Sequence, residues 1–228
     1  MALRVIDLGS VSGIEWLATP YAICDRLTPH ADPAVVFAEP LEPCLSVGAN
    51  QNIHRDIDRP FCRRQGIPIV RRHIGGSALY IDRDQLVFHV VTPKRRAPRP
   101  ASQLLVRLGA GLADTLRDFG IASELRRPAD IVVGRRKIAG IAGAAIGDNV
   151  VVGGTLLFDF DTATMTRCLR FPSEELRAKV ADLLDRGTTT MRRELGTPPT
   201  RDIVKAHLVT HLTRWLVTEH LEHTAASD

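Results

Sequence analysis

The sequence predicts an α/β protein, because two kinds of segment are interspersed along its 228 residues. Short apolar runs bounded by glycine, proline or polar residues are typical of strands. Longer stretches with an apolar residue every three or four positions are typical of helices that bury one face. With 44% hydrophobic residues, the chain can also bury a substantial core. We expect one domain over residues 1–223 and a disordered tail over residues 224–228.

Eight apolar runs predict strands, and residues that favour turns separate them. Pro40 and Pro43 mark a turn between two early runs, and Gly75, Gly76 and Ser77 form a small-residue loop between two later ones. The strand, loop and strand around these small residues fit a hairpin. In chain order, the predicted strands span residues 3–8, 34–38, 44–47, 67–72, 85–91, 130–133, 137–141 and 150–158.

Five segments predict helices, and polar residues suited to capping precede most of them. Pro20 breaks the first helix, which has an imperfect apolar stripe. Asp58 and Ser102 are the expected N-caps of the second and third helices, and Gly120 ends the third. Ser173 begins the fourth helix with an imperfect capping box. In chain order, the predicted helices span residues 14–27, 58–65, 103–119, 173–184 and 200–222, and the last is the longest.

Net charge and hydropathy narrow the classes of partner. The formal net charge of +4 suits an acidic partner but is too small to indicate nucleic acid. The apolar runs are far shorter than the roughly 20 residues that cross a bilayer, so we expect no membrane partner. The N-terminus lacks a signal-peptide pattern, and we therefore expect a cytoplasmic protein.

The spacing of cysteine and histidine gives no metal signature. The cysteines form no Cys-x-x-Cys pair, and we expect them to be reduced thiols. His207 and His211 are four residues apart, but leucine at position 208 departs from the His-Glu-x-x-His zinc pattern. We interpret them, and His220 with His223, as solvated helix histidines. The cysteines are Cys24, Cys44, Cys62 and Cys168.

The most informative stretch combines two adjacent arginines with the small-residue loop. Arg71 and Arg72 follow an apolar run and precede Gly75, Gly76 and Ser77. Glycine lets the backbone approach a ligand closely, and arginine offers donors suited to a carboxylate or phosphate. Successive strand residues point to opposite faces, so we expect one arginine to face a ligand and the other solvent or a carboxylate. A plain hairpin with surface arginines also fits this spacing.

A second stretch puts Lys137 inside an apolar run that continues to Gly140. A lysine within a strand conflicts with the local pattern, and such conflicts are more common at functional sites. Its ammonium could bridge a substrate carboxylate and a phosphate, and so stabilise charge in a transition state. The alternative is a lysine at a strand end whose head reaches solvent.

Four further polar residues are candidates with weaker signals. Asp82 and Asp130 could orient the cations or hold Mg²⁺ through their oxygens, and either could equally be a turn aspartate. Gln51 and Asn52 could shape a ligand pocket or simply cap a turn.

In this order, these segments resemble the lipoate-protein ligase family, within the larger biotin and lipoate ligase superfamily. The family pattern begins with Gly-x-x-Gln-Asn, then Arg-Arg-x-x-Gly-Gly-Gly-Ala-Val and a His-Asp pair. Asn-Asp then precedes Gly-x-Lys-(Ile/Val)-x-Gly-x-Ala, and His-Gly-Thr-Leu-Leu follows. The resemblance covers about residues 34–195, and its matching segments are 48–52, 71–82, 130–143 and 152–157.

The resemblance implies an α/β fold of the α+β type, with mixed or antiparallel sheets packed against helices. It implies an enzyme that activates lipoate, or a similar medium-chain acid, with ATP and Mg²⁺ to an acyl-adenylate. The acyl group would then pass to a lysine of an acidic lipoyl domain or H protein. In the family motif, the lysine that matches Lys137 contacts the acyl-adenylate. The implied substrate- or nucleotide-binding residues are Gln51, Asn52, Arg71, Arg72, Gly75, Gly76, Ser77, Asp82, Asp130, Gly140, Gly154 and Thr155.

Two alternatives stay open. Octanoyltransferases of the superfamily use a cysteine nucleophile, and Cys168 lies at a comparable position in one branch, although a buried structural thiol also fits it. A non-catalytic acyl- or nucleotide-binding paralogue is the other, because Ser77, Ile81, Ala129 and Gly153 replace a glycine, histidine, asparagine and histidine of the family pattern. The resembling ligases often carry a C-terminal accessory domain, so we expect weak or no overall ligation by the chain alone and name a separate accessory subunit as a candidate partner.

Overall fold

The structure is a computed structural model that describes residues 2–126 and 129–218. Its strands are β1 (Arg4–Val11), β2 (Ala34–Pro40), β3 (Cys44–Val47), β4 (Ile69–Arg71), β5 (Leu79–Ile81), β6 (Gln85–Pro93), β7 (Ser123–Arg126), β8 (Asp130–Val133), β9 (Arg136–Ile146) and β10 (Asn149–Leu157). Its helices are α1 (Gly13–Cys24), α2 (Ile53–Asp56), α3 (Arg59–Arg64), α4 (Gln103–Asp118), α5 (Thr162–Cys168), α6 (Glu174–Gly187), α7 (Met191–Leu195), α8 (Arg201–Thr213) and a π-helical turn (Arg214–Thr218).

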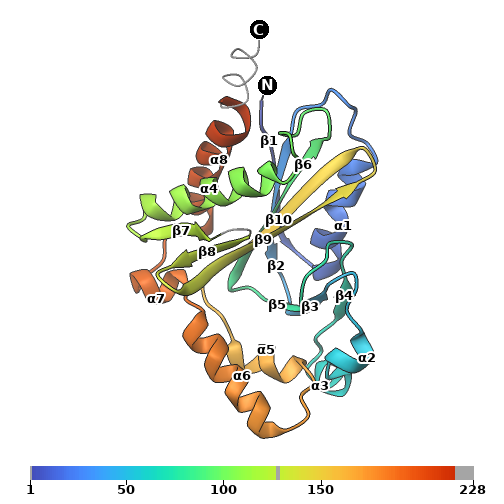
Figure 1. Ribbon diagram of the computed structural model, residues 1–228, viewed down its shortest axis with the longest axis vertical. Helices are drawn as coiled ribbons and strands as arrows, with labels where there is room; N and C mark the ends of the chain where they lie inside the picture. Colours follow the sequence, from blue (N-terminus) through green and yellow to red (C-terminus); the bar gives the residue numbers. More distant parts are fainter. Residues whose placement is uncertain (1, 127–128, 219–228) are drawn as a thin grey trace.

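Two mixed sheets organise these elements (Figure 1). The larger is seven-stranded, in the order β1-β2-β6-β10-β9-β8-β7. Its β1 and β2 are parallel, and its other neighbouring strands are antiparallel. The smaller sheet has the order β4-β3-β5, with β4 parallel and β5 antiparallel to β3. The predicted α/β fold with mixed sheets is confirmed.

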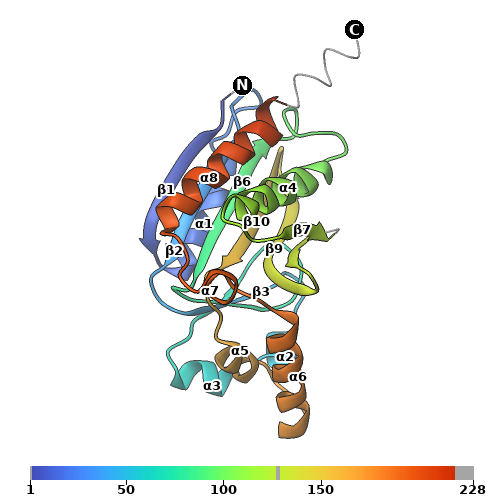
Figure 2. The same cartoon turned by 90° about the vertical axis from the view of Figure 1, so that its left-hand side faces the viewer.

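Helices cover both faces of the larger sheet, and alternation along β6 separates the two cores. Phe88 and Val90 pack into the core that contains the apolar side chains of α4 and α8. Val87 packs instead with Trp16 and Leu17 of α1. Successive strand residues point to opposite faces, so β6 contributes to both layers. Helices α4 and α8 lie side by side on their face of the sheet (Figures 1 and 2).

The predicted apolar stripe of α4 is confirmed, but its predicted cap is not. Leu104, Leu108, Leu112 and Leu116 recur at helical spacing and are buried. Ser102 has αR backbone angles and makes no capping hydrogen bond through its side chain, because the turn before α4 already continues helically into it.

Other helix boundaries differ from the predictions in ways that local chemistry explains. A capping box joins Ser12 and Glu15 at the start of α1, and the helix continues through Pro20 to Cys24 rather than breaking there. Ser173 caps α6 by accepting a hydrogen bond from the backbone N–H of Leu176. Three predictions lie partly or wholly outside the described residues. They are the end of the helix 200–222, the histidines His220 and His223, and the tail 224–228.

The plain hairpin, one of the two interpretations of this stretch, does not form, because its two strands belong to different sheets. β4 lies in the smaller sheet and β6 in the larger one, and β5 was not predicted. β5 completes the smaller sheet by pairing antiparallel with β3, through Cys44, Leu45 and Ser46. The loop of small residues therefore connects two strands that flank β3.

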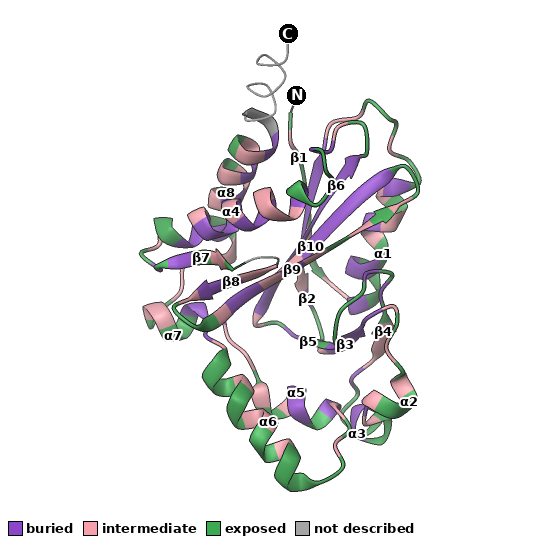
Figure 3. Cartoon of the chain, in the orientation of Figure 1, coloured by how far each residue is buried: buried purple, intermediate pink, exposed green. Residues whose placement is uncertain are grey.

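The smaller sheet and helices α2, α3, α5 and α6 form a lobe at one end of the molecule (Figures 1 and 2). Its core joins Leu45 and Tyr80 of the sheet to Phe61 of α3 and Met165 of α5. Helix α6 has no buried residue, and Figure 3 shows it largely exposed. None of the helices described in residues 2–126 and 129–218 is long and apolar enough to span a bilayer.

Candidate functional site

Two cavities adjoin between the larger sheet and the lobe. The larger encloses about 850 Å³ and the smaller about 420 Å³. The wall that both cavities share is formed by Ser77, Leu79, Lys137, Gly140 and Thr155. All of these except Leu79 were predicted from the sequence as site residues. A ligand bound in either cavity can therefore contact this wall.

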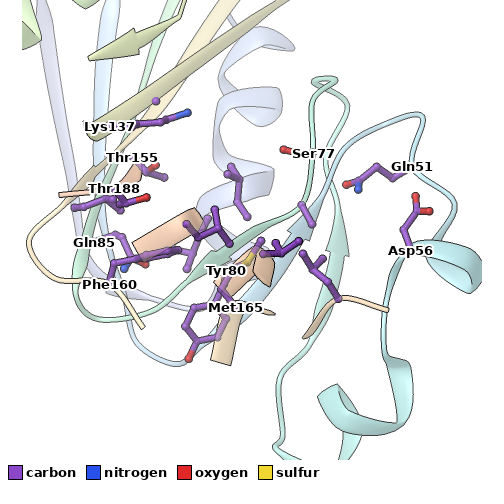
Figure 4. A pocket seen from close by; sticks show the side chains of 18 of the residues that line it. Gln51, Asp56, Ser77, Tyr80, Gln85, Lys137, Thr155, Phe160, Met165 and Thr188 are labelled. Atoms are coloured by element: carbon purple, nitrogen blue, oxygen red, sulfur yellow. The ribbon is translucent and has the colours of Figure 1, made fainter. Parts of the chain in front are cut away.

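The larger cavity has an apolar floor and a polar rim (Figure 4). Lys137 and Thr155 lie on one side of it, and Gln51 and Ser77 on the other. The floor between them is formed by Tyr80, Leu157, Phe160, Met165, Leu169 and Leu184. Charged side chains at the rim are Arg55, Asp56 and Arg170. The cavity can thus hold a large ligand with both flat apolar and anionic parts.

The smaller cavity lies between α1, the small-residue loop and the sheet. Trp16, Leu17 and Tyr21 of α1 and Ile74 of the loop supply its apolar walls. Glycines form its remaining walls and let a ligand approach the backbone closely. These glycines are Gly75, Gly76, Gly140, Gly143, Gly153 and Gly154. Its polar side chains are Arg72, Ser77, His89, Asp130, Lys137 and Thr155. This lining suits a narrow apolar chain with an anionic end.

Lys137 is held in place by Asp130 and by the absence of a side chain at position 140. Its Nζ lies 2.6 Å from Asp130 Oδ1, and its side chain is 42% exposed. A Cβ at Gly140 would lie 2.7 Å from both Cε and Nζ of Lys137. Gly140 pairs with Asp130 across β8 and β9, so the lysine lies over the glycine to reach the carboxylate. The backbone carbonyl of Lys137 also accepts a hydrogen bond from Thr189.

The Asp130 carboxylate is ionised at neutral pH. Burial opposes its ionisation, but the ion pair with Lys137 and the contact of Arg126 with Oδ2 outweigh burial and lower the pKa of Asp130. A carboxylate oxygen is a ligand type that Mg²⁺ accepts, usually together with substrate phosphates and water. Within residues 2–126 and 129–218, no group of three or more His, Cys, Asp or Glu side chains could hold a metal ion. Asp130 could therefore supply one ligand to Mg²⁺, with substrate phosphates and water supplying the others.

Arg72 is buried and holds the small-residue loop from within. Its guanidinium donates to the carbonyl oxygens of Ser46, Gly75 and Ser77, at 2.9, 3.0 and 2.7 Å. The loop also packs closely against the turn after β3, because a Cβ at Gly48 would lie 1.9 Å from the Gly76 carbonyl oxygen. Arg72 thus positions the loop backbone in the wall of the smaller cavity.

Arg71 points to the other side of its strand, as the alternation predicted. Its guanidinium donates to the carbonyls of Gly48 and Ala49, both at 2.9 Å, and not to a carboxylate. It lines a third hollow together with Asn52, outside the two cavities. Asn52 caps α2 by accepting from two backbone N–H groups, and Gln51 accepts from the Gly48 N–H while lining the larger cavity.

Asp82 lines neither cavity. Its side chain accepts a hydrogen bond from the backbone N–H of Asp84, and burial raises its pKa. Its neighbour Gln85 does line the larger cavity, and the Gln85 side-chain amide donates to the carbonyl of Asp159. Of the predicted residues, Arg71, Asn52 and Asp82 therefore line neither cavity, and the others line one or both.

Cys168 is a buried thiol that lines neither cavity. It is fully buried and hydrogen-bonded to Cys62, and that contact together with burial raises the pKa of Cys168. All four cysteines are free and buried, and none of them lines either cavity. A thiol in this setting is a poor nucleophile, because the thiolate is the reactive form.

Several residues that line the cavities were not predicted from the sequence, and of these His89 carried a usable signal. His89 is a polar residue in an otherwise apolar strand, the same kind of conflict that marked Lys137. Trp16, Tyr80 and Phe160 carried no such signal, because apolar residues in regular elements are usually core.

The sequence model of the family described as lipoyl protein ligase A/B catalytic domain matches residues 14–213. A lipoate-protein ligase from Bacillus subtilis is 26% identical over 171 residues, which cover 75% of this chain and 51% of the relative. An octanoyltransferase from Carboxydothermus hydrogenoformans is also 26% identical, over 197 residues that cover 78% of this chain and 72% of the relative. The chain thus spans about half the length of the Bacillus ligase.

Solved structures share the fold. A chain from the structure of a bi-partite lipoate protein ligase and its E2 lipoyl domain, from Thermoplasma acidophilum, superposes with a TM-score of 0.86 at 21% identity. That match covers 95% of this chain and 84% of the archaeal one. A lipoate-protein ligase A bound with ATP superposes with a TM-score of 0.80 at 21% identity, over 95% of this chain and 86% of that one.

Proposed function

Since the chain belongs to the lipoyl protein ligase A/B catalytic-domain family, we propose that it activates lipoate, or a similar medium-chain acid, with ATP and donates the acyl group to a protein lysine. One observation carries this proposal. Lys137 lies in the wall shared by two cavities of different size and character. A cation at such a junction can contact a carboxylate from one cavity and a phosphate from the other.

The smaller cavity is the proposed acyl site and the larger one the proposed nucleotide site. The smaller cavity has mainly apolar and glycine walls, which suit an aliphatic chain. The larger has about twice the volume, and it offers aromatic side chains for a base and Arg55 and Arg170 for phosphates. In this arrangement, the acid carboxylate and the α-phosphate meet at Lys137 and Thr155.

In the first step, a carboxylate oxygen attacks the α-phosphorus of ATP. A new C–O–P linkage forms, the bond from the α-phosphorus to the bridging oxygen breaks, and pyrophosphate leaves. The Lys137 ammonium stabilises the negative charge that develops on the α-phosphoryl oxygens. Asp130 positions that ammonium through the 2.6 Å ion pair. Mg²⁺, when bound, would neutralise phosphate charge and share at most the Asp130 carboxylate.

In the second step, the neutral ε-amine of an acceptor lysine attacks the acyl carbon of the adenylate. The carbon–oxygen bond to AMP breaks, an amide forms, and the amine loses its proton to solvent. We propose an acidic lipoyl domain or H protein as the acceptor, which the net charge of +4 favours. The four free thiols suit the reducing cytoplasm, which we propose as the location of this reaction.

An accessory subunit is a further part of the proposal. The archaeal ligase that superposes with a TM-score of 0.86 is bi-partite. A separate polypeptide that covers the cavities would exclude water from the adenylate. We therefore expect ligation by this chain to increase when such a partner is supplied.

The second candidate is an acyltransferase that moves octanoyl or lipoyl groups between carrier proteins without ATP. The octanoyltransferase among the relatives favours it. The position of Cys168 opposes it, because a thioester relay needs a thiol at the acyl carbon and this thiol is buried outside both cavities. A module that binds acid or nucleotide without catalysis is the third candidate.

Pyrophosphate release separates the three candidates. The chain is mixed with Mg-ATP in the presence and absence of lipoate, and separately with an octanoyl-loaded carrier protein and an acceptor domain without ATP. The proposed ligase releases pyrophosphate only when lipoate is present. Acceptor acylation without ATP would instead establish the transferase, and ligand binding without either reaction would establish the non-catalytic module.

A further inference from the structure

His89 is a polar residue in an apolar row of β6. The residues of this strand that face α1 are Val87, His89 and Val91, and the two valines pack into apolar clusters. The histidine is buried too, with 7% of the residue exposed, whereas both valines are fully buried. Burial lowers the pKa of His89 to about 4, so the ring is neutral at neutral pH.

The ring is fixed between a tryptophan and a glycine. It stacks on Trp16 of α1, with ring centroids 5.2 Å apart and planes inclined by 28°. On the neighbouring strand β10, Gly153 is paired directly with His89. A Cβ at position 153 would lie 2.3 Å from the His89 Cδ2, so the ring occupies the space where a side chain of residue 153 would stand.

The pairing of the strands determines how far His89 lies from Gly140, the glycine beside the Lys137 ammonium. Gly140, which the lysine side chain covers, pairs with Thr155 on β10. Gly153 follows on the same face, two residues away along β10, and pairs with His89 on β6. Two strand spacings of about 4.8 Å and two residues of about 3.4 Å separate the Cα atoms of Gly140 and His89 by about 12 Å.

We propose that His89, braced by Trp16, is a specificity-determining residue that closes the far end of the acyl pocket and limits the length of the acid it accepts. Lys137 and His89 both line the smaller cavity, and His89 and Trp16 do not line the larger one. A carboxylate held at Lys137 therefore directs the chain of a medium-chain acid toward the stacked rings. This inference rests on the proposed function for the assignment of the acyl pocket.

The sequence context agrees with this role. Gly153 stands where the resembling family has a histidine, and this chain carries its imidazole at the paired position of the adjacent strand. Only one of the two positions can hold a ring, because both rings would fill the same space. The ring at position 89 is backed by Trp16, which keeps it from swinging away when a chain presses on it.

Calorimetric titration of acids against the ATP-free protein tests this inference. The ligands are lipoate, octanoate and dodecanoate, and the proteins are wild type, His89→Ala and His89→Phe. Wild type should bind octanoate and lipoate more tightly than dodecanoate. His89→Ala should raise the affinity for dodecanoate relative to octanoate by about tenfold or more, because each newly buried methylene contributes favourably. His89→Phe keeps a ring at the end of the pocket and should preserve the wild-type order.

Trp16→Leu opens the same end from the helix side and gives an independent variant should His89→Ala fail to fold. Melting temperatures and circular dichroism establish which variants are folded. An unchanged length preference in a folded His89→Ala or Trp16→Leu protein overturns the inference and leaves the proposed ligase intact. Absence of binding of all three acids to the wild type overturns the acyl pocket itself, and with it both proposals.

Discussion

Two neighbours of Lys137 determine where its ammonium lies. Asp130 attracts the ammonium, and Gly140 leaves the space that the end of the lysine side chain occupies. Both neighbours were predicted as ligand-binding residues. The contacts indicate that they position Lys137 as well as lining the cavities.

Gly140→Ala should impair catalysis with little loss of stability. The new Cβ would lie 2.7 Å from Cε and Nζ of Lys137, which are the movable end of a flexible side chain. We expect the lysine to move aside, and the rate of adenylate formation to fall by about tenfold or more because one preorganised charge contact is lost. Pyrophosphate release and the melting temperature measure the two effects.

Gly187→Ala is the matched control for that substitution. No atom lies within 4 Å of a Cβ at position 187, and the residue ends α6. It should change neither rate nor stability. A Gly140→Ala protein that works at the wild-type rate would argue against a role for the lysine position.

Lys137→Ala should lower adenylate formation by about 10²-fold or more, because its charge is worth most where the phosphoryl group gains negative charge. The fold should persist, since an exposed ion pair contributes little to stability. Arg135→Ala removes an exposed cation two residues away and serves as the control. Activity within a few-fold of wild type in the folded Lys137→Ala protein would remove the lysine from the mechanism.

At the scale of elements, the pairing of β6 with β10 determines the end of the smaller cavity. Gly153→Ala should destabilise the protein by about 1–3 kcal/mol, because the added methyl overpacks against a ring that cannot move easily. The ring is held on its other side by Trp16. Replacing His89 by alanine as well should recover part of this loss.

A double-mutant cycle on Gly153 and His89, followed by urea unfolding, measures this coupling. Gly153→Ala should lower the unfolding free energy less in the His89→Ala background than in the wild type. Additive effects of the two substitutions would mean that the two strands do not constrain each other here.

Burial of His89 also makes stability depend on pH. Its pKa is about 4 in the folded protein, against about 6.5 when unfolded, so protons bind preferentially to the unfolded chain between these values. Stability therefore falls as the pH is lowered below about 6.5, and His89 should account for about 2 kcal/mol between pH 7 and pH 5. His89→Phe lacks the titrating group, so its unfolding free energy should fall less over this range. An equal fall in unfolding free energy in both proteins would mean that a group other than His89 causes the pH dependence.

Which elements could be predicted depended on how local their signals are. The stripe of leucines in α4 is visible in the sequence because one helix face is wholly buried. β5 was missed because it has only three residues, and only its partner β3 gives it a structural context. The capping box at Ser12 and Glu15 was visible in the sequence but was overlooked.

At the scale of the whole molecule, the sequence motifs predicted many of the residues that line the two cavities, but not the shape of the cavities. The small-residue loop, the Lys137 strand and the Gly153 strand come from segments far apart in the chain, and no local pattern shows that they enclose two cavities. The role of Arg72 also depends on tertiary structure, because its three carbonyl partners become visible only once the loop is folded.

No cysteine lines either cavity, so catalysis should not need a thiol. Cys168→Ala should retain lipoate-dependent pyrophosphate release at close to the wild-type rate, with a lower melting temperature because the side chain is fully buried. Loss of turnover in a folded Cys168→Ala protein would favour the transferase mechanism. Cys62→Ala removes the hydrogen-bond partner and controls for the structural effect.

The most direct measurement follows the acyl group through a single turnover. The protein is mixed with lipoate and Mg-ATP and quenched in acid, and mass spectrometry weighs both the intact chain and the small molecules. An adenylating enzyme with its acid and nucleotide joined at Lys137 should yield an unmodified chain, released lipoyl-AMP and pyrophosphate. A chain that gains the mass of the acyl group, with no lipoyl-AMP formed, would contradict the account and point to a covalent thioester.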